Sequence, residues 1–360
     1  MAFGASAANA GITIPAGDWT IDIGGNVNAF YTNTKLSGAL DAADENRAET
    51  IQTGLLPSAL GIGGKTRQND LDIAFQFTFF TGADSGTGTG LGNNTLNIRQ
   101  AYMTFGDASW GTIKLGRDLG IYGSDAILSD MTLLGVGAGA GAGGSSTLGR
   151  IGSGYMYADW VGQISYMSPN WNGFSFAAGI REPWSNSESN TDIRSDIGFE
   201  GKVSYEWAGD VAGKVWLGAI SQKHSRDTGA VDQYTSRGWD VGGKVSLAGL
   251  NLVGYYYDGK GLSGNTDSLG GGLIANGVFF LDNAQKSDDN GGYVQATYAL
   301  PGIGTKLGLS YGVSKSESDI NDVDFENKSW IVGAYHPLTK SLNLVAEYTH
   351  NKVENLKGLS

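Results

Sequence analysis

Apolar and polar residues alternate over many short stretches of this chain, and this pattern limits its possible folds more than any other feature. The stretch 196–207 shows the pattern most clearly: its apolar members are Ile197, Phe199, Val203, Tyr205 and Trp207. Charged or hydroxyl residues stand between most of them. Successive side chains of a β-strand point to opposite faces, so the stretch predicts a strand with one apolar face and one face in water.

About fifteen stretches with this periodicity are expected to be strands. They are residues 18–33, 58–68, 69–81, 95–107, 111–118, 161–168, 174–181, 196–207, 214–226, 237–247, 251–258, 292–300, 306–314, 329–337 and 342–350. Short connections such as 248–249 and 339–341 alternate along the chain with long ones such as 227–236 and 260–289. Short turns at one end and long loops at the other are typical of an outer-membrane β-barrel.

Composition agrees with a β-barrel and excludes several other classes. The chain has 58 glycines, only 6 prolines and no cysteine in 360 residues, and its net charge is −12. Without cysteine there are no disulfides and no thiolate metal sites, and the acidic balance argues against a nucleic-acid partner. No run of 18 apolar residues is present, so a membrane-spanning form has to be a closed barrel of strands.

One stretch carries a family resemblance. Residues 99–118, RQAYMTFGDASWGTIKLGRD, form two strand-like runs with a short joint, and a long glycine-rich segment follows at 119–150. Residues 126–134 of that segment have room for one or two helical turns, with Ser124 or Asp125 as the N-cap. The combination resembles the general diffusion porins of Gram-negative outer membranes. The resemblance implies a trimeric barrel of 16 antiparallel strands whose third loop, here residues 119–150, folds into the lumen and narrows the channel.

The two ends of the chain lead to further expectations. The resemblance implies a sixteenth strand after the last loop, whereas this sequence stops at NLKGLS, so we expect the closing strand to be missing. Residues 1–10 end in Ala8, Asn9 and Ala10, which is typical of the tail of a signal peptide, with an ordinary leader as the alternative. Residues 11–360 are then a single barrel domain, reaching the outer membrane after signal-peptide-dependent export.

Charged residues near the long loop are the candidates for the pore constriction. Alternation places Lys114, Asp118 and Arg181 toward the lumen, and Arg99 lies beside inward Asn97. Strict counting puts Arg117 on the apolar face, but the resemblance implies a guanidinium of the pore wall at this position. The remaining candidates belong to the loop: Asp125, Asp130 and Arg150.

Opposed bases and acids across a narrow gap filter ions and orient dipolar solutes. In the alternative, these arginines and aspartates only pair with one another and pin the loop to the wall. The resemblance implies arginine at two wall positions where this chain has Ala59 and Met167. We therefore expect the channel to select weakly between ions, with cations favoured over anions.

The predicted function is passive diffusion of small hydrophilic solutes and ions. Alternatives are a channel specific for a sugar or organic acid, an outer-membrane hydrolase and a secreted lectin-like protein. No GxSxG elbow, phosphate loop or paired histidine motif supports an enzyme, and we expect no cofactor and no metal site. Expected partners are two further copies of the chain, outer-membrane lipid and lipopolysaccharide. Aromatic residues including Trp216, Tyr255 and Tyr257 are expected in interfacial girdles, with a sugar-binding track as the alternative.

Overall fold

The structure is a computed structural model that describes residues 11–37, 47–83, 96–140, 146–183, 193–226, 234–262, 287–318 and 323–355. Most of these residues are in antiparallel strands, which build a 17-stranded sheet and a separate two-stranded hairpin. The strands of the sheet are β1 (Ile12–Ala16), β2 (Trp19–Asn26), β5 (Ser58–Gln68), β6 (Leu71–Thr81), β7 (Asn97–Asp107), β8 (Gly111–Leu119), β9 (Trp160–Met167), β10 (Phe174–Arg181), β11 (Ile193–Ser195), β12 (Gly198–Trp207), β13 (Val211–Arg226), β14 (Tyr234–Leu247), β15 (Leu250–Lys260), β16 (Asp288–Ala299), β17 (Lys306–Ser318), β18 (Val323–Thr339) and β19 (Leu342–Asn355). The hairpin pairs β3 (Phe30–Lys35) with β4 (Arg47–Gln52).

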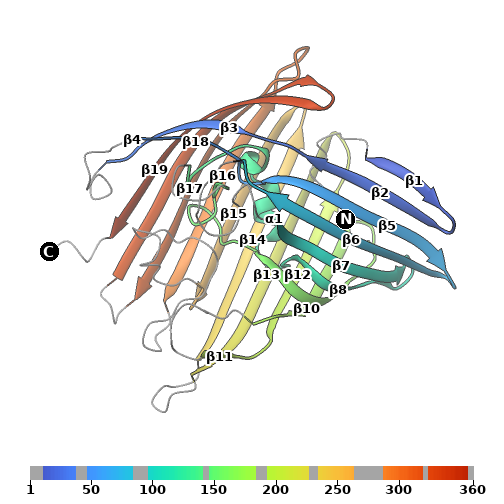
Figure 1. Cartoon of the computed structure of the whole chain (residues 1–360). Coiled ribbons are helices and arrows are strands. Elements are labelled where there is room, and N and C mark those ends of the chain that lie inside the picture. The colour runs from blue at the N-terminus through green and yellow to red at the C-terminus, as the bar shows by residue number, and fades with distance from the viewer. Residues whose placement is uncertain are drawn as a thin grey trace.

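Most strands of the sheet pair with the next strand along the chain, and the exceptions are β2 with β5, β10 with β12 and β11 with β13. The ladder runs from β1 through β2 and β5 to β10, and from β12 onward to β19. The three-residue strand β11 lies beside the outer part of β13. Two-residue turns such as Ala248–Gly249, both with positive φ, close hairpins at one end, because this backbone shape matches the twist of paired strands. The sheet curves into a barrel (Figure 1).

Every stretch that the sequence analysis expected to be a strand is one, although residues 18–33 are interrupted at 27–29 between β2 and β3. Three strands were missed: β1, β4 and β11. Without β11 the sheet has the expected sixteen strands, but β1 accounts for one of them. The number sixteen is therefore reached with a strand at the N-terminal end of the described residues. The expectation about a closing strand after the last loop concerns positions that lie outside the described residues.

The two faces of the barrel differ in chemistry. Exposed apolar side chains such as Phe77, Leu217, Leu252, Val294 and Leu309 alternate along their strands with buried polar residues. The buried partners include Thr78, Gln222, Gln295 and Ser310. Because a membrane barrel is apolar toward lipid and polar toward its lumen, this alternation is the one required of a chain that crosses a membrane with strands.

Two short helices occupy the inside of the barrel. The helix α1 (Ser124–Ser129) and the 3₁₀-helix η2 (Met131–Leu134) belong to the connection between β8 and β9, and α1 lies at the centre of the molecule in Figure 1. The expected N-cap was wrong: α1 begins after Gly123, whose φ of 72° suits a glycine. Among the described helices, none is long and apolar enough to cross a membrane.

Candidate functional site

The connection between β8 and β9, residues 120–159, folds into the barrel and is called the inner loop below. Its two ends meet where the Gly120 N–H donates to the Asp159 carbonyl at 2.9 Å. On β9, the Gln163 side-chain amide donates to the carbonyls of Asp118 (3.2 Å) and Leu119 (3.0 Å). The base of the inner loop is thus closed by hydrogen bonds before the chain turns into the lumen.

Carboxylates of the wall accept the backbone N–H groups of the first part of the inner loop. Glu200 on β12 accepts from Ile121 (2.6 Å) and Tyr122 (3.3 Å). Asp240 on β14 accepts from Gly123 at 3.1 Å. Glu200 is also paired with the buried Arg181 of β10. Since the N–H of the N-cap Gly123 has no intrahelical acceptor, Asp240 supplies one, and Glu200 does the same for the two N–H groups that precede the helix.

Charges and side-chain amides of the wall then hold α1. The Asp125 carboxylate pairs with Lys202, at 2.5 Å, and with Lys214. Burial raises the pKa of Asp125, but the two lysines outweigh burial and leave that pKa below its ordinary value. On β16, Gln295 bridges the break between the helices: its amide donates to the Ser129 carbonyl (2.9 Å) and its oxygen accepts from the Met131 N–H (2.8 Å).

Asp130 joins the first part of the inner loop, residues 120–140, to its returning part, residues 146–159. One carboxylate oxygen accepts from the Thr132 N–H at 2.9 Å and so caps η2. The other accepts from the Arg150 N–H (3.2 Å) and from the Tyr155 hydroxyl (2.8 Å). Asp130 is buried, so these hydrogen bonds replace the water that its carboxylate loses on burial.

Arg150 anchors the returning part and is fully buried, although it is a charged side chain. Its Nε donates to the Ser310 hydroxyl of β17 at 2.5 Å, and its Nη1 donates to the Ser329 hydroxyl of β18 at 3.0 Å. Nη1 also lies 3.3 Å from the carbonyls of Ser153 and Ser329. Burial lowers the pKa of this guanidinium, and the charge of Asp130 opposes that effect.

The tip of the inner loop is held by β19 and by the segment that precedes β5. Glu347 on β19 accepts from the N–H groups of Val136 (2.9 Å) and Gly137 (2.7 Å). The Leu55 N–H donates to the Gly135 carbonyl at 3.0 Å, and the Thr147 N–H donates to the Gly54 carbonyl at 3.2 Å. The inner loop therefore spans the lumen from β12 to β19, fixed to several strands in turn.

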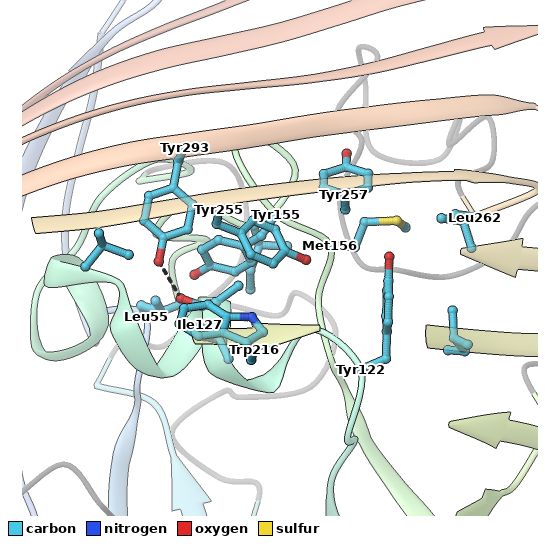
Figure 2. Close-up of a cluster of buried hydrophobic side chains, with 14 residues drawn as sticks. Leu55, Tyr122, Ile127, Tyr155, Met156, Trp216, Tyr255, Tyr257, Leu262 and Tyr293 are labelled. Carbon is cyan, nitrogen blue, oxygen red and sulfur yellow. Dashed lines mark hydrogen bonds between the residues drawn. The ribbon is translucent and has the colours of Figure 1, made fainter. Parts of the chain in front are cut away.

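Behind α1 and the returning part of the loop, aromatic side chains form a buried apolar cluster (Figure 2). Its members from the wall are Trp216, Ile220, Val253, Tyr255, Tyr257, Leu262 and Tyr293, and those from the inner loop and its neighbourhood include Tyr122, Ile127, Tyr155 and Met156. The Tyr293 hydroxyl donates to the Ala126 carbonyl at 2.8 Å, the dashed bond of Figure 2. The expectation that Trp216, Tyr255 and Tyr257 belong to interfacial girdles was wrong, since all three are buried against the loop.

The remaining candidate residues lie on the strands before the loop. Asp118 is buried, accepts from the Gln100 amide at 2.8 Å and pairs with Lys114. Lys114 also lies over the Tyr102 ring, 4.9 Å from its centroid, and Arg99 lies over the Phe80 ring at the same distance. Arg117 is opposite Ala101 and Gly162, on the same face of β8 as Leu115. This outward placement differs from the pore-wall position that the resemblance implies.

The structure thus brings Asp125, Asp130, Arg150 and Arg181 together with wall side chains that the sequence analysis did not select. Those wall residues are Glu200, Asp240, Gln295, Tyr293 and Glu347. Alternation marked Glu200 as inward, but its loop partner is about 80 residues away in sequence, and nothing in a single sequence pairs the two. In the described part of the chain, no cluster of three or more His, Cys, Asp or Glu side chains is suited to a metal ion.

Comparison with known proteins gives one family and several related structures. A family model described as Gram-negative porin matches residues 1–356. No curated protein sequence matches the chain significantly. The outer-membrane channel DcaP of Acinetobacter baumannii superposes with a TM-score of 0.67 at 15% identity, over 96% of this chain and 94% of that one.

Two further structures share the fold. The anion-selective porin from Comamonas acidovorans has a TM-score of 0.64 at 17% identity, and the alignment covers 93% of this chain and 90% of that porin. The OmpF of Salmonella typhi, solved in complex with daunomycin, has a TM-score of 0.60 at 18% identity and covers 95% of this chain and 100% of its own.

Proposed function

The chain belongs to the Gram-negative porin family, and on that premise we propose that the inner loop sets the constriction of its channel. A protein of this family is an outer-membrane channel for the passive diffusion of small hydrophilic solutes, and it is not an enzyme. What remains to be assigned is the part of this barrel that limits the passage of solutes and the residues that do so.

The observation that carries the proposal is the row of anchors from β12 to β19. Glu200, Asp240, Gln295 and Glu347 each accept hydrogen bonds from backbone N–H groups of the inner loop. A segment fixed at so many points stays across the lumen while solutes pass, because all anchors have to open together before the segment moves away. The inner loop therefore keeps its position across the lumen and does not open and close as a gate.

Within this constriction the candidate residues divide into two groups. Asp125, Asp130, Arg150 and Arg181 are buried and bound to partners that hold the loop in place, and Asp118 is buried beside Lys114 of its own strand. Lys114 and Arg99 lie over aromatic rings of β7 and β6, Tyr102 and Phe80. Since each acidic group of the loop has a cationic or hydrogen-bonding partner, we propose weak ion selectivity and no strong transverse field.

A labelled cysteine in the inner loop tests the proposal. The chain has no cysteine, so Leu128→Cys, at an exposed position of α1, is the only site for a thiol reagent. We expect single-channel conductance in a planar bilayer with KCl to fall when a bulky methanethiosulfonate is attached. The control is Leu309→Cys, on the outward face of β17. An equal response of the two variants, from folded protein, would show that the constriction lies elsewhere.

The assembly and export of the channel are further parts of the proposal. A homotrimer is supported by the related OmpT of Vibrio cholerae, which was solved in a trimer form with a TM-score of 0.57 at 13% identity. Conductance steps in multiples of three, and a heat-sensitive trimer band on denaturing gels, are expected. Residues 1–10 are proposed as the tail of a signal peptide and residues 11–360 as one barrel domain, which N-terminal sequencing of exported protein tests.

Contact with lipopolysaccharide is also proposed, at the end of the barrel from which the inner loop enters. Charged side chains at the ends of β17 to β19 form an alternating chain of ion pairs: Lys315–Glu326–Lys328–Glu354–Lys352. Such a chain of exposed charges is suited to phosphate groups and their divalent counter-ions. Co-purification of lipopolysaccharide, reduced in a Lys328→Gln and Lys352→Gln variant, is the expected result.

A further inference from the structure

Two leucines of the inner loop are turned away from its anchors. Leu128, in the last turn of α1, is 52% exposed, and Leu134, at the end of η2, is 40% exposed. Their neighbours Ile127 and Leu133 pack into the apolar cluster behind the loop. Each helical turn therefore directs one apolar side chain to the wall and presents another on the free side of the loop.

The acids of the same segment are not on its free side. Asp125 and Asp130 are both buried, one between two lysines and the other among the Thr132, Arg150 and Tyr155 donors. A carboxylate that is buried and neutralised acts weakly on a passing ion, whereas an exposed apolar side chain touches the solute directly. Among the described residues of the inner loop, the side chains most exposed to a solute are thus apolar.

At Gly61 and Gly63 the inward face of β5 has no side chains, and Thr78 and Gln76 of β6 lie opposite these two positions. Gly61 and Gly63 lie beneath the Gln76 side chain: a Cβ at either position would come within 3.0 Å of its amide. Gln76 itself donates to the Thr78 hydroxyl at 3.1 Å. This part of the wall provides amide and hydroxyl groups, and Lys65 follows on the same face of β5 two residues beyond Gly63.

We propose that the constriction selects solutes by their apolar surface. Leu128 and Leu134 form an apolar edge that favours small solutes with an aliphatic or aromatic group, such as apolar amino acids, over wholly polar solutes of equal size and charge. The inference rests on the proposed function, because it requires the inner loop to bound the path of the solute. The physical basis is the removal of apolar surface from water when the solute passes the leucines.

The test compares leucine with asparagine, which are close in size and both zwitterionic, in liposome-swelling assays. For the wild-type channel we expect leucine to enter about fivefold faster, since roughly 40 Å² of apolar surface would leave water at the constriction. The variant Leu128→Asn with Leu134→Asn keeps side-chain size and should bring the ratio close to one. Leu96→Asn, at an exposed position immediately before β7, is the matched control and should keep the wild-type ratio.

The outcomes separate this inference from the proposed function. A wild-type ratio near one, in protein with normal KCl conductance, overturns the apolar edge but leaves the channel intact. A preference for leucine that survives the double substitution also overturns it, because the two leucines would not be its source. Folded protein without any KCl conductance refutes the channel and the inference together.

Discussion

The fully buried Arg150 provides the sharpest test of how the inner loop is held. The change is Arg150→Met, which keeps the length of the side chain and removes its charge and donors. The guanidinium donates to Ser310, Ser329 and the Ser153 carbonyl. After the substitution the two serine hydroxyls lose their donor, and Asp130 loses the positive charge beside it.

The magnitude follows from these contacts. A hydrogen bond from a charged donor contributes about 1.5–3 kcal/mol, and the contributions of neighbouring bonds are not additive. Removing one member of a buried charged network is strongly destabilising. The net cost in free energy is about 3 kcal/mol and not more, because methionine has no charge that must leave water on folding. Since 1.4 kcal/mol corresponds to a factor of ten, the population of detached loop should rise about 100-fold.

Thiol labelling measures that population. Ala138→Cys places a small thiol at a buried position of the inner loop, next to the Gly149 carbonyl that accepts from the residue 138 N–H at 2.9 Å. Its labelling rate should increase about 100-fold when Arg150→Met is added. Arg117→Met, at an exposed arginine of β8, is the control and should leave the rate unchanged. A rate within threefold of the parent, in folded trimers, would refute the anchoring role of Arg150.

Two other predictions use the same labelling assay. The pKa of Asp125 is lowered by its two lysines, so this anchor is charged and intact above the ordinary carboxyl pKa of 3.8 and is lost as the pH falls below that value. Labelling of Ala138→Cys should therefore rise in that acidic range. Asp125→Asn should abolish this pH dependence. Gly312→Ala should detach the loop at a cost of about 1–3 kcal/mol, because its Cβ would collide with the Ser153 carbonyl. Gly254→Ala, whose Cβ has no atom within 4 Å, should be neutral; similar labelling of both glycine variants would contradict the close packing of loop and wall.

The fold was largely predictable because alternation is a local property. Each strand from β5 to β10 and from β12 to β19 contains its own period-two pattern, which needs no knowledge of partners. The missed strands lack that pattern: β1 is only five residues long and contains Pro15, and β4 has Ile51 as its single large apolar residue. Both become strands through pairing with β2 and β3, which is tertiary context.

The site was predictable only as a location. The long segment after β8 was correctly expected inside the barrel. Asp125 and Asp130 are buried in it and hold it in place, and their role as charges of the pore constriction stays a prediction. Arg150 looked like a pore residue and is fully buried. Trp216 was assigned to the lipid interface although it shares the parity of Lys214, a signal that the sequence contained. Partners such as Glu347, some 210 residues from Gly137, have no local signature.

The most direct test of the central claim is an engineered disulfide between the inner loop and the wall. The Cβ of a residue replacing Gly154 would lie 3.1 Å from the Cβ of Tyr293 on β16, so a separation by a few tenths of an ångström brings the pair into the range of about 3.5–4.5 Å that disulfides span. Gly154→Cys with Tyr293→Cys should cross-link on mild oxidation, and the oxidised channel should conduct as the reduced one does, because the bond joins segments already in contact. The control, Gly154→Cys with Val294→Cys on the outward face, should not cross-link. Equal cross-linking of both pairs, or a large change of conductance on oxidation, would contradict an inner loop fixed within the barrel.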